Sequence, residues 1–122
     1  KLNAKDYIRA ERIREDASRT FARAFEEVDI LLTPAVPVPA PHRTLDDPSV
    51  ESESNKIRPR MTQNTRIFNL LGLPALSVPC GFTGQGLPVG LQIAGAWWSE
   101  KTLLQVGNAY ERATPWHTMR PE

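Results

Sequence analysis

The chain has 122 residues, the size of one domain, and its 15 lysine and arginine residues nearly balance its 14 aspartate and glutamate residues. Basic residues do not concentrate on one segment, so the charge distribution gives no reason to expect nucleic-acid binding. No apolar run approaches the roughly 20 residues of a membrane helix. A single cysteine cannot form an internal disulfide, which suits the reducing conditions of the cytoplasm, so we expect a cytoplasmic protein with no membrane or nucleic-acid partner.

Residues 1–28 are expected to form an amphipathic helix. Asn3 is the expected N-cap, because its side chain can accept a hydrogen bond from an unpaired backbone N–H of the first turn. Apolar residues recur at steps of three or four with charged residues between them, namely Ile13, Ala17, Phe21, Ala24 and Val28. A helix with one such stripe needs an apolar surface on which to lie.

Residues 29–34 (DILLTP) form an apolar run without alternation, which predicts a core strand buried on both faces. Residues 35–58 are expected to form a loop. Three prolines hold its first part extended, and the rest is almost entirely polar or charged. A loop of this length inside a domain is often functional.

The second half of the chain alternates helix and strand. A helix is expected over residues 59–72, with Gly72 as a left-handed C-terminal cap. Two strands are expected within residues 75–95, paired as a hairpin, and a last helix over residues 99–114 with Ser99 as its N-cap. The order of elements predicts an α/β fold in which helices are layered on a mixed β-sheet.

Side chains with catalytic potential are scattered singly along the sequence. Cys80 lies in a predicted strand with no adjacent base, and His42 and His117 lie far from it in sequence, so we interpret Cys80 as a packing residue and expect no metal site. The glycines of residues 81–86 precede a strand and lack a lysine, which indicates a turn and no phosphate-binding loop. None of the serines lies in a nucleophile elbow, so we expect no catalytic residue and no cofactor in this chain.

Four blocks of the sequence, in order and spacing, resemble the C-terminal end of an amidase signature enzyme. They are residues 29–34 (DILLTP), 64–81 (NTRIFNLLGLPALSVPCG), 86–95 (GLPVGLQIAG) and 100–105 (EKTLLQ). The resemblance implies an enzyme that hydrolyses a carboxylic amide to a carboxylate and ammonia or an amine, through a serine nucleophile, a bridging cis-serine and a lysine base. In that family these catalytic residues lie upstream of the matched blocks and are absent from this chain.

The resemblance therefore identifies residues 1–122 as a C-terminal fragment of an amidase domain. We expect the chain alone to be inactive, because packing and binding groups cannot replace a nucleophile and a base. Its expected partners are the missing N-terminal catalytic part and a small-molecule amide substrate. The sequence does not specify which amide, because most of the pocket would come from the missing part.

In the family, this region completes the core and forms one wall of the substrate pocket. The residues expected at that wall are Thr33, Pro34, Thr62, Asn64 and Phe68, and a role in packing alone remains equally open. In members that hydrolyse glutamine on behalf of tRNA, an acidic residue that holds the substrate's amino group falls where this chain has Thr62. A neutral threonine cannot pair with an ammonium as a carboxylate does. We therefore favour a general amidase over the A subunit of a glutamine-dependent aminoacyl-tRNA amidotransferase.

A different class of function stays open, that of a non-catalytic remnant or interaction module whose exposed core face binds another chain. In either case, a sheet that lacks its neighbours has an unpaired edge or an uncovered apolar face. We therefore expect self-association through exposed core surface.

Overall fold

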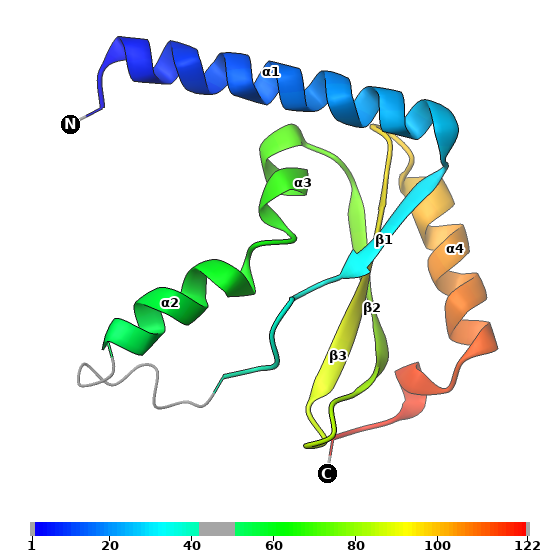
Figure 1. Ribbon diagram of the computed structural model, residues 1–122. Helices are drawn as coiled ribbons and strands as arrows, with labels where there is room; N and C mark the ends of the chain where they lie inside the picture. Colours follow the sequence, from blue (N-terminus) through cyan, green and yellow to red (C-terminus); the bar gives the residue numbers. More distant parts are fainter. Residues whose placement is uncertain (1, 42–50, 122) are drawn as a thin grey trace.

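The computed structural model describes residues 2–41 and 51–121 (Figure 1). Its helices and strands follow the expected order, with one additional helix. They are α1 (Ala4–Glu27), β1 (Ile30–Pro34), α2 (Glu51–Met61), α3 (Arg66–Leu71), β2 (Ala75–Phe82), β3 (Pro88–Gly95) and α4 (Glu100–Ala113), followed by a short 3-10 helix (Trp116–Thr118).

The three strands form one sheet in the order β1-β3-β2, and both pairs of neighbours are antiparallel. The hairpin predicted within residues 75–95 is confirmed as the pair of β2 and β3, and its glycine-rich connection closes with Thr83 accepting two backbone N–H groups. The register shifts between Pro79 and Gly81, which leaves Cys80 as the extra residue of a β-bulge. The α/β class is therefore confirmed, with a sheet whose described strands are all antiparallel.

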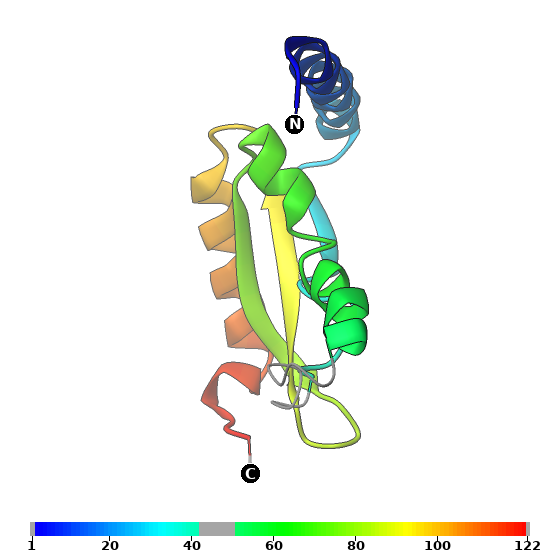
Figure 2. The same ribbon diagram turned by 90° about the vertical axis from the view of Figure 1, so that its left-hand side faces the viewer.

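Helices cover both faces of this sheet, and Figure 2 shows α4 on one side of it and α2 on the other. Successive side chains of a strand point to opposite faces of the sheet, and those that point toward α4 are apolar. Val78 and Ile93 are buried there against Leu103 of α4. On the other face, Ala94 packs with residues of and around α3 and with the C-terminal half of α1, namely Phe68, Leu71, Leu73, Ala17, Phe21 and Phe25. The core is thus two thin apolar layers separated by the sheet.

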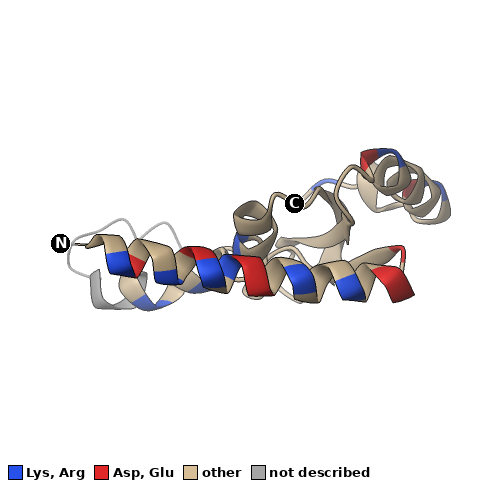
Figure 3. Cartoon of the chain, turned by 90° about the horizontal axis from the view of Figure 1, so that it is seen from above, with Lys and Arg blue, Asp and Glu red and all other residues tan. Residues whose placement is uncertain are grey.

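Helix α1 begins with the predicted N-cap. The Oδ1 of Asn3 accepts from the backbone N–H of Asp6 at 3.0 Å, and an Asp6 carboxylate oxygen accepts from the backbone N–H of Asn3 at 3.2 Å. Figure 3 shows lysine and arginine interspersed with aspartate and glutamate along the helix. No residue of α1 is buried, and its N-terminal half extends beyond the sheet (Figure 1). Only the half that carries Phe21 and Phe25 has an apolar surface to contact.

The expectations for residues 35–72 are partly wrong. Residues 51–58, predicted as loop, belong to α2, and residues 42–50 lie outside the described part. The single helix expected over 59–72 is two helices, because Pro59 lies in the last turn of α2 and residues 62–65 turn the chain before α3. The sequence of α2 has glutamate, lysine and arginine, which favour helix without making an apolar stripe. Gly72 does end α3 in the left-handed conformation, with φ 67°.

The prediction that residues 29–34 are buried on both faces is also wrong for this chain. Strand β1 lies at an edge of the sheet, and the side chain of Leu32 is 57% exposed. An apolar run indicates that a strand is suited to burial, whereas the exposure of its side chains depends on which elements pack against it. Ser99 precedes α4 as expected, but its hydroxyl donates to the carbonyl of Ala96 at 2.7 Å and does not cap the helix.

Candidate functional site

A cluster of polar groups lies where β1 ends, and a glutamine from the central strand holds it together. Gln92 is only 4% exposed. Its Nε2 donates to the Oγ1 of Thr33 at 3.0 Å and to the backbone carbonyl of Asn64 at 3.2 Å. The Nδ2 of Asn64 donates in turn to the carbonyl of Pro34 at 2.8 Å. The structure thus brings together three of the residues expected at the pocket wall, Thr33, Pro34 and Asn64.

Strand register explains this arrangement. Thr33 on β1 pairs directly with Gln92 on β3, so the two side chains lie on the same face of the sheet. The backbone N–H of Ala35 donates to the carbonyl of Gly90 at 2.9 Å and holds the chain against β3 beyond the end of β1. The turn between α2 and α3 then reaches the same face through Asn64. The buried side chain of Gln92 therefore bonds to residues that lie 28 and 59 positions earlier in the sequence.

Thr62 lies in the same turn and contacts a cation. The Nε of Arg66 donates to the Oγ1 of Thr62 at 2.8 Å, and the backbone N–H of Arg66 donates to the Thr62 carbonyl at 3.0 Å. Among the side chains of residues 2–41 and 55–121, Arg66 has no carboxylate within ion-pair distance. The sequence from residue 55 to residue 99 has four basic residues and no acidic one. Thr62 is therefore in direct contact with a positively charged group, the guanidinium of Arg66.

Phe68, the fifth expected wall residue, is in the hydrophobic core. It is 5% exposed, and its ring meets that of Phe21 edge-on with centroids 6.0 Å apart. Packing between α1, α3 and the sheet accounts for a phenylalanine at this position. Phe68 is therefore left out of the proposed wall.

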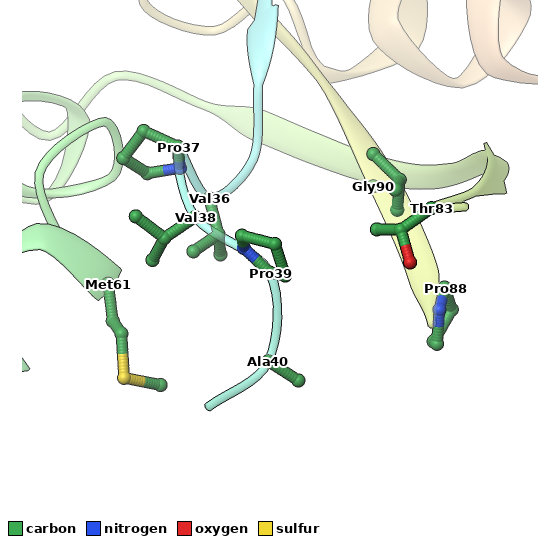
Figure 4. Close-up of a pocket in the computed structure, with 10 residues that line it drawn as sticks. Val36, Pro37, Val38, Pro39, Ala40, Met61, Thr83, Pro88 and Gly90 are labelled. Carbon is green, nitrogen blue, oxygen red and sulfur yellow. The ribbon is translucent and has the colours of Figure 1, made fainter. Parts of the chain in front are cut away.

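An apolar pocket of about 380 Å³ adjoins the polar cluster. Figure 4 shows the segment 36–40 passing between Met61 on one side and Thr83, Pro88 and Gly90 on the other. Gly90 connects the pocket to the cluster, because its carbonyl accepts from Ala35 directly after β1. Met61 immediately precedes Thr62. The pocket and the polar groups therefore share one side of the sheet and one end of β1.

Sequence reasoning missed Gln92 and the segment 36–40. A lone glutamine between Leu91 and Ile93, in the middle of an apolar strand, was a usable signal, because a buried polar side chain must find hydrogen-bond partners. The identity of those partners required the strand register. The prolines of the segment predicted extended chain, whereas residues 35–38 bend, and they gave no indication of a pocket.

The described residues show no cluster of three or more histidine, cysteine, aspartate or glutamate side chains that could hold a metal ion. Cys80 is a free, half-buried cysteine beside a shallow pocket of about 220 Å³ that Leu32 and Thr33 also line, and His42 lies outside the described part. In the part of the chain described, no helix is long and apolar enough to cross a membrane. On α1, the pKa of Arg14 is raised by its hydrogen bond to Glu11 and by the charge of that carboxylate, an exposed surface pair.

Comparison with known proteins extends these observations. The A subunit of glutamyl-tRNA(Gln) amidotransferase from Thermosynechococcus vestitus is 43% identical over 119 residues, which are 95% of this chain and 23% of that protein. The solved structure of 6-aminohexanoate cyclic dimer hydrolase complexed with substrate is 27% identical with a TM-score of 0.83, covering 100% of this chain and 27% of that one. The solved structure of the A subunit of glutamyl-tRNA(Gln) amidotransferase from Thermotoga maritima is 29% identical with a TM-score of 0.74, covering 89% of this chain and 23% of that one.

The chain spans less than a quarter of the length of the curated relative above. The arrangement of its helices and strands is shared with both solved structures, as their TM-scores show. The family described as Amidase matches residues 1–104, which include β1, the polar cluster around Gln92 and the hairpin. By fold and by sequence, this chain belongs to the amidase family.

Proposed function

We propose that this chain is the C-terminal part of an amidase, an enzyme that hydrolyses a carboxylic amide to a carboxylate and ammonia or an amine. The observation that carries the proposal is the amidase match over residues 1–104. The nucleophilic serine, the cis-serine and the lysine base belong, in this proposal, to an upstream part of the protein. Support comes from the small share of each relative that the chain covers and from the lack of a nucleophile-and-base pair in its sequence.

The role proposed for this chain is one wall of the substrate pocket. Thr33, Pro34, Thr62 and Asn64 would supply its polar groups, and the apolar pocket beside them would hold the substrate's hydrocarbon part. Small-molecule sites typically combine a mostly apolar lining with a few fixed polar groups, and this surface has both. A small-molecule amide is thus the proposed ligand, and the upstream catalytic part is the proposed partner in a cytoplasmic protein.

The environment of Thr62 favours a general amidase. A site for glutamine must hold a positively charged ammonium, for which a carboxylate is the matching partner. Here the hydroxyl of Thr62 is occupied by the guanidinium of Arg66 at 2.8 Å. A second cation at this position would be repelled, so we propose a substrate without an ammonium next to the wall.

A second candidate is the A subunit of a glutamine-dependent aminoacyl-tRNA amidotransferase, which the 43% identity to a protein of that name favours. A third is a non-catalytic module. The sequence upstream in the gene separates the third from the others, because a Gly-Gly-Ser-Ser-Gly-Gly type segment in frame would provide the serine nucleophile. Glutamine hydrolysis that depends on a charged tRNA and on partner subunits would identify the second.

The test compares the 122-residue chain with the protein that includes its upstream region, by measuring ammonia release from a panel of aliphatic, aromatic and amino-acid amides. We expect the longer protein to be active on amides without an ammonium and the 122-residue chain to be inactive. Cys80→Ala in the longer protein should leave turnover unchanged. Activity of the short chain that Cys80→Ala abolishes would overturn the proposal.

A further inference from the structure

The amide group of Gln92 has only one orientation that fits its neighbours. The backbone carbonyl of Asn64 can only accept a hydrogen bond, so the Gln92 atom 3.2 Å from it must be the nitrogen. The same nitrogen lies 3.0 Å from the Oγ1 of Thr33. Both hydrogens of the Gln92 amide are therefore donated within the protein, and the turned-over amide would place oxygen against oxygen.

This orientation sets the direction of the Thr33 hydroxyl. Because its Oγ1 accepts from Gln92, the hydroxyl hydrogen is left to donate elsewhere. Within residues 2–41 and 55–121 that hydrogen has no acceptor, and Thr33 is only partly buried. The hydrogen is thus available to a bound molecule.

The groups beside Thr33 also present donors. The side-chain nitrogen of Asn64 donates to the carbonyl of Pro34 at 2.8 Å, which uses one of the two hydrogens of that amide. Arg66, the first residue of α3, adds a positive charge beside Thr62, and the stretch from residue 55 to residue 99 has no acidic residue. A surface of this kind suits the acceptor oxygen of a ligand, either a carbonyl or a carboxylate.

We propose that Gln92 is a positioning residue that commits the Thr33 hydroxyl to donating a hydrogen bond to an acceptor oxygen of the substrate. The inference rests on the proposed function, since it assigns Thr33 to the wall of an amidase pocket. It goes beyond that function by naming the residue that acts directly on the substrate, the residue that orients it, and the kind of atom recognised.

Thr33→Val removes the hydroxyl and keeps the shape of the side chain, and Thr33→Ser restores it. In the protein with its upstream region, Thr33→Val should raise KM for the preferred amide about 3- to 10-fold, the range for one lost hydrogen bond, and Thr33→Ser should recover most of the loss. Thr20→Val is the matched control, because it makes the same change at an exposed threonine of α1 that bonds only within its own helix. Its KM should equal that of the wild type.

A double-mutant cycle distinguishes positioning from a structural role. Gln92→Met keeps the length of the side chain but frees the Thr33 hydroxyl to rotate, so it should raise KM as Thr33→Val does. If Gln92 acts through Thr33, the double variant has the KM of Thr33→Val alone, whereas independent structural damage would multiply the two effects. Gln92→Glu should also raise KM, because an ionised carboxylate accepts the Thr33 hydrogen and withdraws it from the substrate.

Thermal unfolding of each variant identifies any that fail to fold, and the Thr33→Val and Thr33→Ser pair then decides the question without Gln92. An active enzyme in which Thr33→Val retains the wild-type KM would overturn the inference and leave the proposed function intact. A wild-type protein that hydrolyses no amide would overturn the proposed function first, and the inference with it, because no substrate oxygen would receive the hydrogen bond.

Discussion

The guanidinium Nε of Arg66 donates a hydrogen bond of 2.8 Å to the Oγ1 of Thr62, and this contact places a positive charge at the proposed wall. The charge disfavours a substrate that carries an ammonium there. Arg66→Gln should therefore raise the ratio of kcat/KM for glutamine to that for glutaramic acid about 2- to 5-fold at low salt, the range for an exposed charge interaction. The two substrates differ only in the ammonium, and ammonia release measures both.

Arg66→Lys is the control for this prediction, because it keeps the charge and loses the planar donor group. Its substrate ratio should remain near that of the wild type. If Arg66→Lys changes the ratio as much as Arg66→Gln, the hydrogen bond to Thr62 and not the charge is responsible, and the electrostatic explanation is wrong.

Phe68 should matter for stability. Phe68→Ala removes a ring that is 5% exposed and packed edge-on against Phe21, so we expect the free energy of unfolding to fall by about 3 to 5 kcal/mol. Leu70→Ala, two residues along the same helix but 52% exposed, should lower it by less than about 1 kcal/mol. Urea denaturation followed by circular dichroism measures both. Equal losses would show that the apolar layer between α1 and the sheet contributes little.

Elements specified by local pattern were predicted correctly from sequence. The periodicity of residues 1–28, the cap at Asn3 and the turn glycines of the hairpin each act within a few residues, and the structure has α1, its capping box and the β2–β3 pair. The exposure of Leu32 could not be predicted in this way, because it depends on which elements cover β1. Helix α2 was missed because it has no apolar stripe by which periodicity could reveal it.

The same difference between local patterns and long-range contacts applies to the candidate site. Thr33, Pro34 and Asn64 came from blocks that resemble a family, and the structure brings them together. Gln92, which joins them, was overlooked because its partners lie 28 and 59 residues away and become neighbours only through strand register. Phe68 belongs to a resembling block as well, but it packs inside the core, since a shared motif does not distinguish lining from packing.

Gly72 ends α3 with φ 67°, in a region that residues with a Cβ rarely adopt. Gly72→Ala should lower the free energy of unfolding by about 1 to 2 kcal/mol. The loss would come from backbone strain alone and not from a steric clash, because a Cβ there meets no atom within 4 Å. Gly84→Ala is the matched control, as its position is equally open and lacks the positive φ. Its unfolding free energy should change by less than about 0.5 kcal/mol. Similar losses in both variants would contradict the strain argument.

The uncovered edge of the sheet leads to a prediction about association of the 122-residue chain. In the described structure β1 pairs only with β3, which leaves its outer backbone groups without a strand partner and its Leu32 side chain 57% exposed. We expect self-association and binding of a hydrophobic dye. Leu32→Lys should weaken association roughly tenfold in analytical ultracentrifugation, whereas Leu2→Lys, at a position 91% exposed before α1, should not. A chain that stays monomeric and binds no dye would show that this edge needs no partner.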